Sequence, residues 1–288
     1  MTSTTGTARR MSWEWLGVVP FFLYALLFLI IPASFLVIGS FQNADGSFTL
    51  GNFIGLFDET VRNSYALSLQ ISLFTALAGG IVGFLMAYAA IAGGLPRFVR
   101  SFLLTFSGVA SNFSGVPLAS AYISTLGRQG MATILLRLAG IDIYSMGFNL
   151  YGIIGLSLAY LYFQMPLMVL IVAPAIDGLK KEWRDASQNL GASNWQYWRY
   201  VALPVLLPSL LGTMILLFGN SLGAYATAFA LVSGTFPLAT ILIGRQIRGE
   251  VLQNPNLGYA VAVGMVVIMS VSIMVYSWLQ RKTERWLR

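Results

Sequence analysis

The sequence predicts an all-α membrane protein whose chain crosses the bilayer six times. Apolar residues make up 57% of its 288 residues and charged residues only 9%, whereas about a quarter of the residues in an ordinary soluble domain are charged. The few charged residues leave long uncharged runs between them, and the positive charges collect on one set of loops. This composition excludes a soluble globular domain.

Each long uncharged run is expected to form one membrane span. A helix needs roughly 20 apolar residues to cross about 30 Å of hydrocarbon, because unpaired backbone groups are too costly in lipid. Pro166 is expected to kink the fourth span. The predicted spans lie near 15–40, 67–92, 101–126, 150–176, 205–232 and 257–280.

The Lys and Arg residues predict which side of the membrane each loop faces. Of the 17 Lys and Arg residues, twelve fall on the side that holds both termini and five on the other side. Cytosolic loops collect positive residues, so the tail 1–14, the loop 178–204 and the basic tail 281–288 are expected in the cytosol. This bias accounts for the net charge of +7, and no nucleic-acid partner is expected.

The two longer loops on the opposite side are expected to contain short helices. One should lie near Leu50–Phe57, and a second should place Met131, Ile134, Leu135 and Leu138 on one amphipathic face. Two alternatives remain open for these loops: they plug the outer mouth of the bundle, or they dock a solute-binding protein.

The chain lacks the residues that most catalytic and metal sites use. It has no Cys and no His, which excludes disulfides, thiol chemistry and the commonest metal ligand. No predicted span contains Asp or Glu. A membrane enzyme would need a convergent group of acids, bases or nucleophiles, so the chain is not expected to be an enzyme.

The loop 178–204 is predicted to form two short helices that meet at a bend. Residues Lys180–Leu190 favour a helix, and Gly191 is suited to a left-handed cap at its end. Ser193 can cap a second helix over Asn194–Val201, before Pro204 begins the fifth span. A rigid bend of this kind can enter a groove on a partner and convert a push into a tilt of the attached spans.

The same loop resembles a motif of one transporter family. It reads Asp185-Ala186-Ser187, then Gly191, then Val201-Ala202-Leu203-Pro204. Each residue alone also suits an ordinary loop or helix start, but the joint spacing is similar to the Glu-Ala-Ala ("EAA") loop of permease subunits of ATP-binding-cassette importers. The run Leu190-Gly191-Ala192-Ser193 and the six-span layout are most similar to permeases of the spermidine/putrescine type.

This resemblance implies a type I importer permease-like bundle in a bacterial-type plasma (inner) membrane. The loop would be the coupling segment, with Asp185 contacting an ATPase subunit, Gly191 forming the turn, and Ala186 and Ala192 allowing close approach. The chain has no G-x-x-x-x-G-K-[ST] loop, so ATP and Mg would be bound by the partner ATPase and no cofactor by this chain. The other implied partners are a second permease, usually a different chain, and an extracytoplasmic solute-binding protein.

Polar residues inside the spans are the candidates for the translocation path. Intramembrane polarity usually faces a cavity or the bundle interior, because an amide that faces lipid is costly. The alternative is that these residues form interhelical hydrogen bonds. The candidates are Asn112, Gln164 and Asn220, with Tyr160 and Tyr225 as aromatic faces.

The expected solute is small and polar, and the resemblance favours a polyamine. Tyrosine rings could hold an ammonium group by cation–π contact, although the spans offer no carboxylate. Phosphonate and ferric ion remain open as alternatives. The rival function is an ion-coupled secondary transporter, which would use an intramembrane carboxylate, a His or a broken-helix sodium site.

Overall fold

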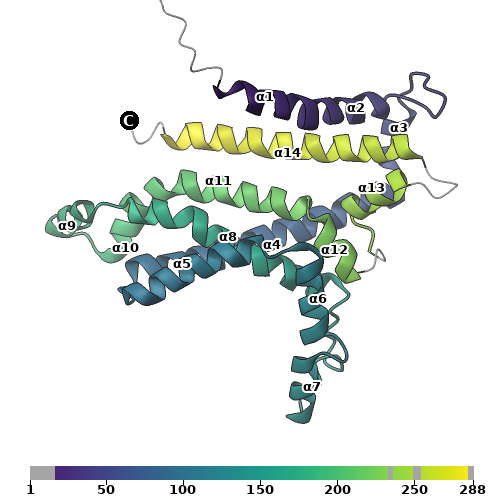
Figure 1. Cartoon of the computed structure of the whole chain (residues 1–288). Helices are drawn as coiled ribbons and strands as arrows, with labels where there is room; N and C mark the ends of the chain where they lie inside the picture. The colour runs from purple at the N-terminus through teal and green to yellow at the C-terminus, as the bar shows by residue number, and fades with distance from the viewer. Residues whose placement is uncertain (1–16, 233–235, 249–253, 285–288) are drawn as a thin grey trace, which may run out of the picture.

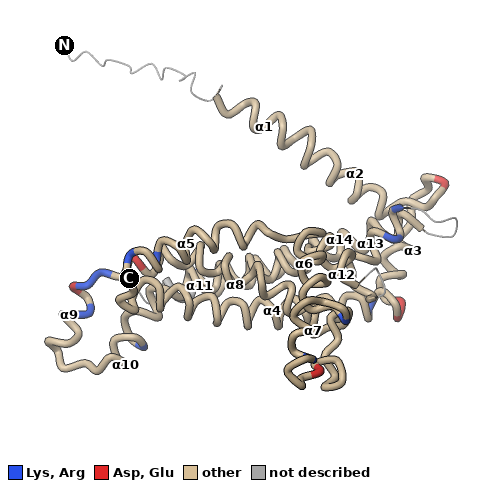
Figure 2. The backbone as a smooth tube through the Cα atoms, turned by 60° about the horizontal axis from the view of Figure 1, so that its bottom comes forward, with Lys and Arg blue, Asp and Glu red and all other residues tan. Residues whose placement is uncertain are grey.

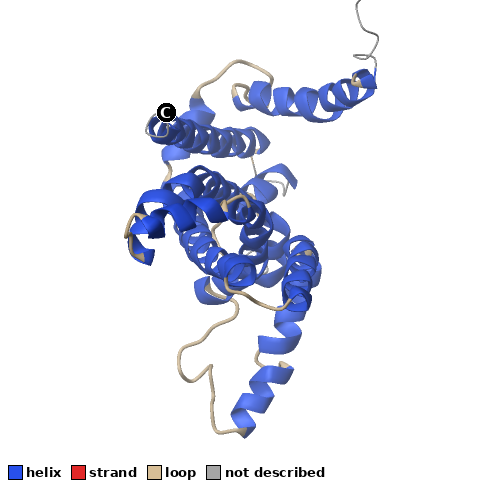
Figure 3. Cartoon of the chain, turned by 90° about the vertical axis from the view of Figure 1, so that its left-hand side faces the viewer, coloured by secondary structure: helices blue, strands red, loops and turns tan. Residues whose placement is uncertain are grey.

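A computed structural model describes residues 17–232, 236–248 and 254–284. The described chain is built of helices and loops, without a strand (Figure 3). The predicted tail 1–14, the start of the first span and residues 285–288 lie outside the described residues. The α-helices are α1 Val19–Ala25, α2 Ile31–Ser40, α3 Gly51–Ile54, α4 Glu59–Ala92, α5 Arg97–Asn112, α6 Gly115–Leu126, α7 Met131–Leu138, α8 Ile153–Asp177, α9 Lys181–Asn189, α10 Asn194–Tyr197, α11 Leu203–Leu222, α12 Tyr225–Val232, α13 Ala239–Arg248 and α14 Pro255–Glu284.

Four long helices form the body of the molecule. Figure 1 shows α4, α5, α8 and α11 side by side, with α14 along α11 and α1–α2 beyond it. α8 is the central helix: Met168, Val169 and Val172 are fully buried against α4 and α11. Charged residues gather at the two ends of this bundle (Figure 2), as helices that cross a membrane require.

Five helices of the described chain are long and apolar enough to cross a membrane. The bent pair Arg97–Asn112 and Gly115–Leu138 would be a sixth span if it is counted as one. The first of them, Val19–Ser40, has the highest mean hydropathy, 2.7, yet none of that window is buried within the chain. α4 begins at Glu59, eight residues before the predicted start of the second span. Pro166 lies inside α8, which runs unbroken from Ile153 to Asp177.

The predicted third span, 101–126, is not one straight helix. α5 ends at Asn112, and the segment Gly115–Leu138 turns away from it by 104°, so that α6 and α7 project from the side of the bundle (Figure 1). Gly115 adopts a left-handed φ of +73°. Pro117 cannot donate to a carbonyl one turn earlier, and its place in the first turn of α6 needs no such bond. The uncharged run 101–126 therefore indicated an apolar helical segment, but it carried no information about the directions in which α5 and α6 run.

The predicted fifth span, 205–232, is also displaced. A continuous helical rod runs from Asn194 to Leu222 and includes α10, a π-helical turn at Trp198–Ala202 and α11. Pro204 thus lies within this rod and does not begin it. Because proline lacks an N–H, the regular bond at that point could not form, and the wider turn just before it keeps the helix continuous. At the other end the rod stops at Gly223, and α12 is a separate helix.

The two predicted loop helices are present. A short helix and a 3-10 turn cover Gly51–Phe57, and α7 covers Met131–Leu138. The apolar residues of α7 that were expected on one face are all exposed: Met131, Ile134, Leu135 and Leu138.

Candidate functional site

The loop 178–204, which we call the elbow, has the bend that the sequence predicts. α9 ends in a pair of capping bonds, in which the N–H of Ala192 donates to the carbonyl of Ser187 at 3.0 Å and the N–H of Gly191 to that of Gln188 at 2.9 Å. Gly191 has a φ of +79°, and no atom lies within 4 Å of the position a Cβ would take. Backbone conformation rather than space therefore requires glycine here.

A second cap fixes the start of α10 directly after this turn. The Oγ of Ser193 accepts from the N–H of Gln196 at 3.3 Å, and the Oε1 of Gln196 accepts from the N–H of Ser193 at 2.7 Å. This reciprocal capping box satisfies two helix-end donors. Since α10 continues into α11, the elbow is connected to a membrane-spanning rod without a flexible joint.

The elbow rests on the bundle through an aromatic contact. The ring of Trp198 meets Tyr88 of α4 edge to face, with the ring centroids 4.9 Å apart, and Ala202 is fully buried. The outer side of the elbow is open: Leu190 is 88% exposed and Trp195 71%. Exposed apolar side chains at the tip of a rigid bend are typical of a protein-docking surface.

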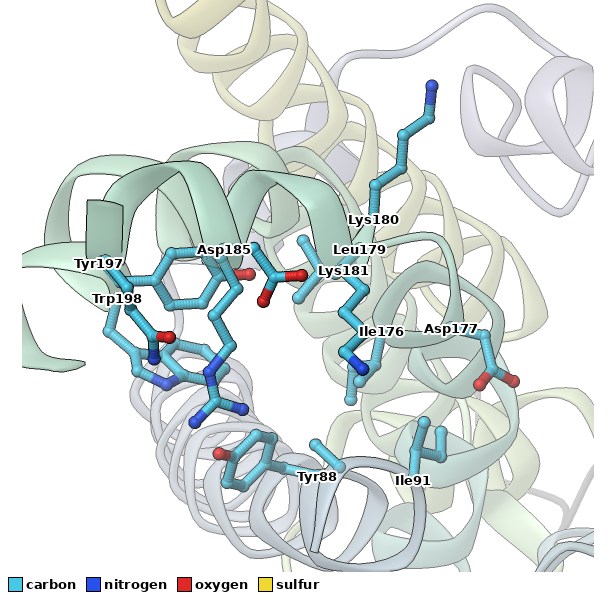
Figure 4. A pocket seen from close by; sticks show the side chains of 13 residues that line it. Tyr88, Ile91, Ile176, Asp177, Leu179, Lys180, Lys181, Asp185, Tyr197 and Trp198 are labelled. Atoms are coloured by element: carbon cyan, nitrogen blue, oxygen red, sulfur yellow. The ribbon is translucent and has the colours of Figure 1, made fainter. Parts of the chain in front are cut away.

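The residues of the predicted motif lie as follows on the elbow. Asp185 and Ala186 are exposed on α9, and Ser187 is half-buried and donates to the carbonyl of Arg184 at 2.7 Å. Ala192 is half-buried in the turn, and Leu203 and Pro204 lie at the start of α11. Asp185 lines a cavity that faces the bundle, which we call the elbow pocket (Figure 4). Its predicted role as a contact to an ATPase subunit stays a prediction.

The elbow pocket has a volume of about 580 Å³ and lies between the elbow and the ends of α4 and α8. Beside it, the guanidinium of Arg100 on α5 donates to the carboxylate of Asp177 at the end of α8. The lining residues are Tyr88, Ile91, Ala92, Ile176, Asp177, Leu179, Lys180, Lys181, Arg184, Asp185, Gln188, Tyr197 and Trp198.

A second cavity, which we call the span pocket, opens where two helices break. It has a volume of about 540 Å³ and lies beside the breaks between α5 and α6 and between α11 and α12. The N–H of Gly115 donates to the Oγ1 of Thr227 at 2.7 Å, which holds the two breaks together. Its lining has no charged residue and consists of Ser111, Asn112, Ser114, Gly115, Phe163, Gly219, Asn220, Gly223, Ala224, Tyr225, Ala226 and Thr227.

Three of the five predicted path residues lie in this cavity. Asn112, Asn220 and Tyr225 line the span pocket, and both amides are exposed to it. The Nδ2 of Asn112 also donates to the carbonyl of Gly108 at 2.9 Å. The backbone at both helix breaks completes the wall of the cavity. A hydropathy pattern does not report backbone groups, so it could not predict this part of the site.

Gln164 and Tyr160 lie outside the span pocket. Gln164 is fully buried; its Nε2 donates to the Oγ1 of Thr75 at 2.9 Å, which lies 3.1 Å from the Oγ of Ser221. The Oε1 of Gln164 has no partner among the described residues. The hydroxyl of Tyr160 donates to the carbonyl of Ala224 at 2.8 Å, at the second helix break. Both side chains thus join helices, which is the alternative the sequence left open.

A cation that belongs to no predicted motif lies behind the span pocket. The guanidinium carbon of Arg248 lies 5.2 Å from the ring centroid of Tyr225 and 5.7 Å from that of Phe229. These rings stack on each other with centroids 5.4 Å apart. Arg248 is at the end of α13, so its approach to Tyr225 depends on tertiary structure and has no local sequence signal.

Comparison with known proteins identifies a family. Residues 71–288 match the family model described as "Binding-protein-dependent transport system inner membrane component". A probable sulfate transport system permease protein of Nephroselmis olivacea is 24% identical over 283 residues, covering 97% of this chain and 93% of that protein. The spermidine/putrescine transport system permease protein PotB of Haemophilus influenzae is 25% identical over 281 residues, covering 91% and 94%.

A solved structure shares the fold. The chain superposes with a TM-score of 0.73 on a chain of a bacterial ABC transporter involved in the import of the acidic polysaccharide alginate. The two are 18% identical, and the match covers 93% of this chain and 95% of the other.

Proposed function

Because the chain belongs to the family of inner membrane components of binding-protein-dependent transport systems, we propose that its elbow couples ATP hydrolysis in a separate subunit to transport through its helical bundle. The chain is a multi-pass permease subunit of an ABC importer. The observation that carries the coupling role is the doubly capped bend, which continues into a membrane-spanning rod. A push on the elbow would therefore be transmitted to α11.

The coupling role implies partners outside this chain. No phosphate-binding loop is present in the sequence, so ATP and Mg would be bound by ATPase subunits that receive the elbow. A second permease would supply a second elbow, and an extracytoplasmic solute-binding protein would deliver the solute. The excess of Lys and Arg on the elbow side favours a cytosolic elbow and cytosolic termini.

For the solute we favour a small oxyanion of the sulfate class over a polyamine. The lining of the span pocket has no carboxylate that would attract a polyamine. α6 and α12 both begin at this pocket, and the first backbone N–H groups of a helix lack intrahelical partners and favour anions. The N–H of Gly115 is already donated to Thr227, so only the other N–H groups at the two helix starts are available to an anion. Arg248 adds a positive charge behind Tyr225. Relatives named as sulfate permeases support this choice, while the relative named PotB keeps the polyamine alternative open.

The test is uptake by the complete complex in vesicles. The chain is co-expressed with the ATPase, second permease and binding protein that adjacent genes encode. Uptake of radiolabelled sulfate and of radiolabelled spermidine is then measured. We expect sulfate uptake only when ATP is supplied on the side of the membrane that the elbow faces. Uptake driven by an ion gradient without nucleotide would refute the importer assignment, and ATP-driven uptake of spermidine alone would refute the oxyanion assignment.

A further inference from the structure

The elbow pocket lies at the ends of two candidate membrane spans, α4 and α8. Its floor is formed by the last turns of two spans, with Tyr88, Ile91 and Ala92 on α4 and Ile176 on α8. Its roof is α9 of the elbow. The ends of membrane-spanning helices are at the level of the interface, so a lipid at this end can present its headgroup to the charged roof and its glycerol region to the apolar floor.

The roof presents charges of both signs to this cavity. Lys181, Arg184 and Asp185 line it from positions three and four residues apart on α9, which share one face of a helix. Figure 4 shows the side chains of Lys181 and Asp185 directed into the cavity, whereas Lys180 points away from it. Within the ranges that the structure describes, no ion pair holds Lys181, Arg184 or Asp185.

The other acid at the cavity is already neutralised. Asp177 accepts from Arg100, which leaves two cations and one carboxylate facing the cavity without a charged partner of their own. All three side chains are exposed, so they are free to make charge-assisted hydrogen bonds to a ligand of complementary charge. A ligand that matches this roof has one phosphate, whose two free oxygens can each accept from a cation, and one ammonium group that can donate to the carboxylate.

We propose that the elbow pocket binds the headgroup of an amine-bearing phospholipid such as phosphatidylethanolamine. Lys181 and Arg184 hold the phosphate. Asp185, which lines the cavity on the side of the bundle, accepts from the ammonium group in place of the ATPase contact that the resemblance implies for it, and the ammonium group also meets the faces of Tyr88 and Trp198. The apolar residues Ile91, Ile176 and Leu179 contact the glycerol region. A volume of about 580 Å³ is within the usual range for a ligand site, roughly 300–1,000 Å³. The bound lipid then braces the elbow against α4 and α8.

The proposal rests on the proposed function only for its consequence in coupling, so the binding itself is tested separately. The full chain, with the subunits that co-purify, is placed in nanodiscs of phosphatidylcholine doped with phosphatidylethanolamine or phosphatidylglycerol. Native mass spectrometry then counts retained lipids. We expect retained phosphatidylethanolamine in the natural protein and at least a fivefold loss in the double variant Lys181→Gln, Arg184→Gln. This measurement needs neither ATP nor transported solute, so its failure and the failure of the proposed function are distinguishable.

A neighbouring lysine provides the matched control. Lys180 is one of the lining residues, but its side chain points away from the cavity, so Lys180→Gln removes one positive charge from the same segment and lipid retention should be unchanged. Equal retention in Lys180→Gln and the double variant would overturn the proposal. The charge-conserving variant Lys181→Arg, Arg184→Lys should restore retention.

Two further measurements identify the ligand. Asp185→Asn should abolish the preference for phosphatidylethanolamine over phosphatidylglycerol, and an unchanged preference would contradict the role of the carboxylate. Inorganic phosphate and soluble phosphoethanolamine are tested for thermal stabilisation of delipidated protein. Stabilisation by inorganic phosphate with no retained lipid would overturn the lipid and assign the pocket to a free anion.

Discussion

The elbow pocket and the span pocket have similar volumes, about 580 and 540 Å³, but they are built in opposite ways. The elbow pocket is lined by charged side chains on a surface helix, next to the ends of spans. The span pocket is lined by uncharged side chains and by backbone at two helix breaks. Water allows charge at the first location, while the second must obtain its polarity from amides, hydroxyls and helix ends because ionised groups inside a membrane are expensive.

The largest effect is expected from straining the bend. Gly191→Val forces a β-branched residue into a left-handed conformation, which costs about 1–2 kcal/mol or more. We expect release of the ATPase subunit and at least tenfold lower uptake, measured by co-purification and vesicle assays, with normal membrane insertion. Gly94→Val is the matched control, since Gly94 has a φ of +71° in open space on the loop between α4 and α5. Full transport by the Gly191→Val variant would contradict the proposed coupling role of the elbow.

Reversing one charge on the elbow should have the next largest effect. Asp185→Lys places a third cation beside Lys181 and Arg184, and we expect ATP hydrolysis to continue with several-fold less uptake. The ratio of phosphate released to solute imported measures this uncoupling. Glu182→Lys makes the same charge change on α9 outside the cavity lining, and an equal ratio in both variants would contradict a specific role for Asp185.

A moderate effect is expected behind the span pocket. Arg248→Gln removes the cation that lies over Tyr225 and Phe229. For sulfate, the solute proposed above, the KM should rise by roughly three- to fivefold because a charge–charge attraction of about 1 kcal/mol is lost. Arg128→Gln is the control: Arg128 lies 5.5 Å from the ring of Tyr144, and neither residue lines the span pocket. Equal KM values for the two variants would remove Arg248 from the path.

The smallest effect separates a lining amide from a packed one. Gln164→Leu removes the donor to Thr75 and should lower the stability of the protein by about 1 kcal/mol with little change in KM. Asn220→Leu changes an exposed amide of the span pocket and should lower uptake two- to threefold at unchanged melting temperature. The melting temperature and an uptake curve are measured for each variant. Lower uptake at unchanged melting temperature in Gln164→Leu, with lower stability and unchanged uptake in Asn220→Leu, would contradict both assignments.

Local chemistry explains which features of the elbow could be predicted. Gly191 ends α9 because a left-handed residue closes the two capping bonds, and Ser193 caps α10 together with Gln196. Both depend on residues within a few positions of each other. The interruption at Gly115 and Pro117 also has a local signal, but hydropathy alone gave a straight third span because it reports apolar content and not direction.

Composition and short-range spacing are enough to predict that the chain is helical, that its apolar runs belong in a membrane and that a capped bend interrupts them. These properties follow from composition and from contacts between neighbours in the chain. Tertiary structure decided which polar residues share a cavity. Asn112 and Asn220 line the same cavity because two helices break side by side, whereas Gln164 is enclosed by α4 and α11. The physical reason is that an amide can satisfy its hydrogen bonds in a cavity or between helices, and only packing selects one of the two.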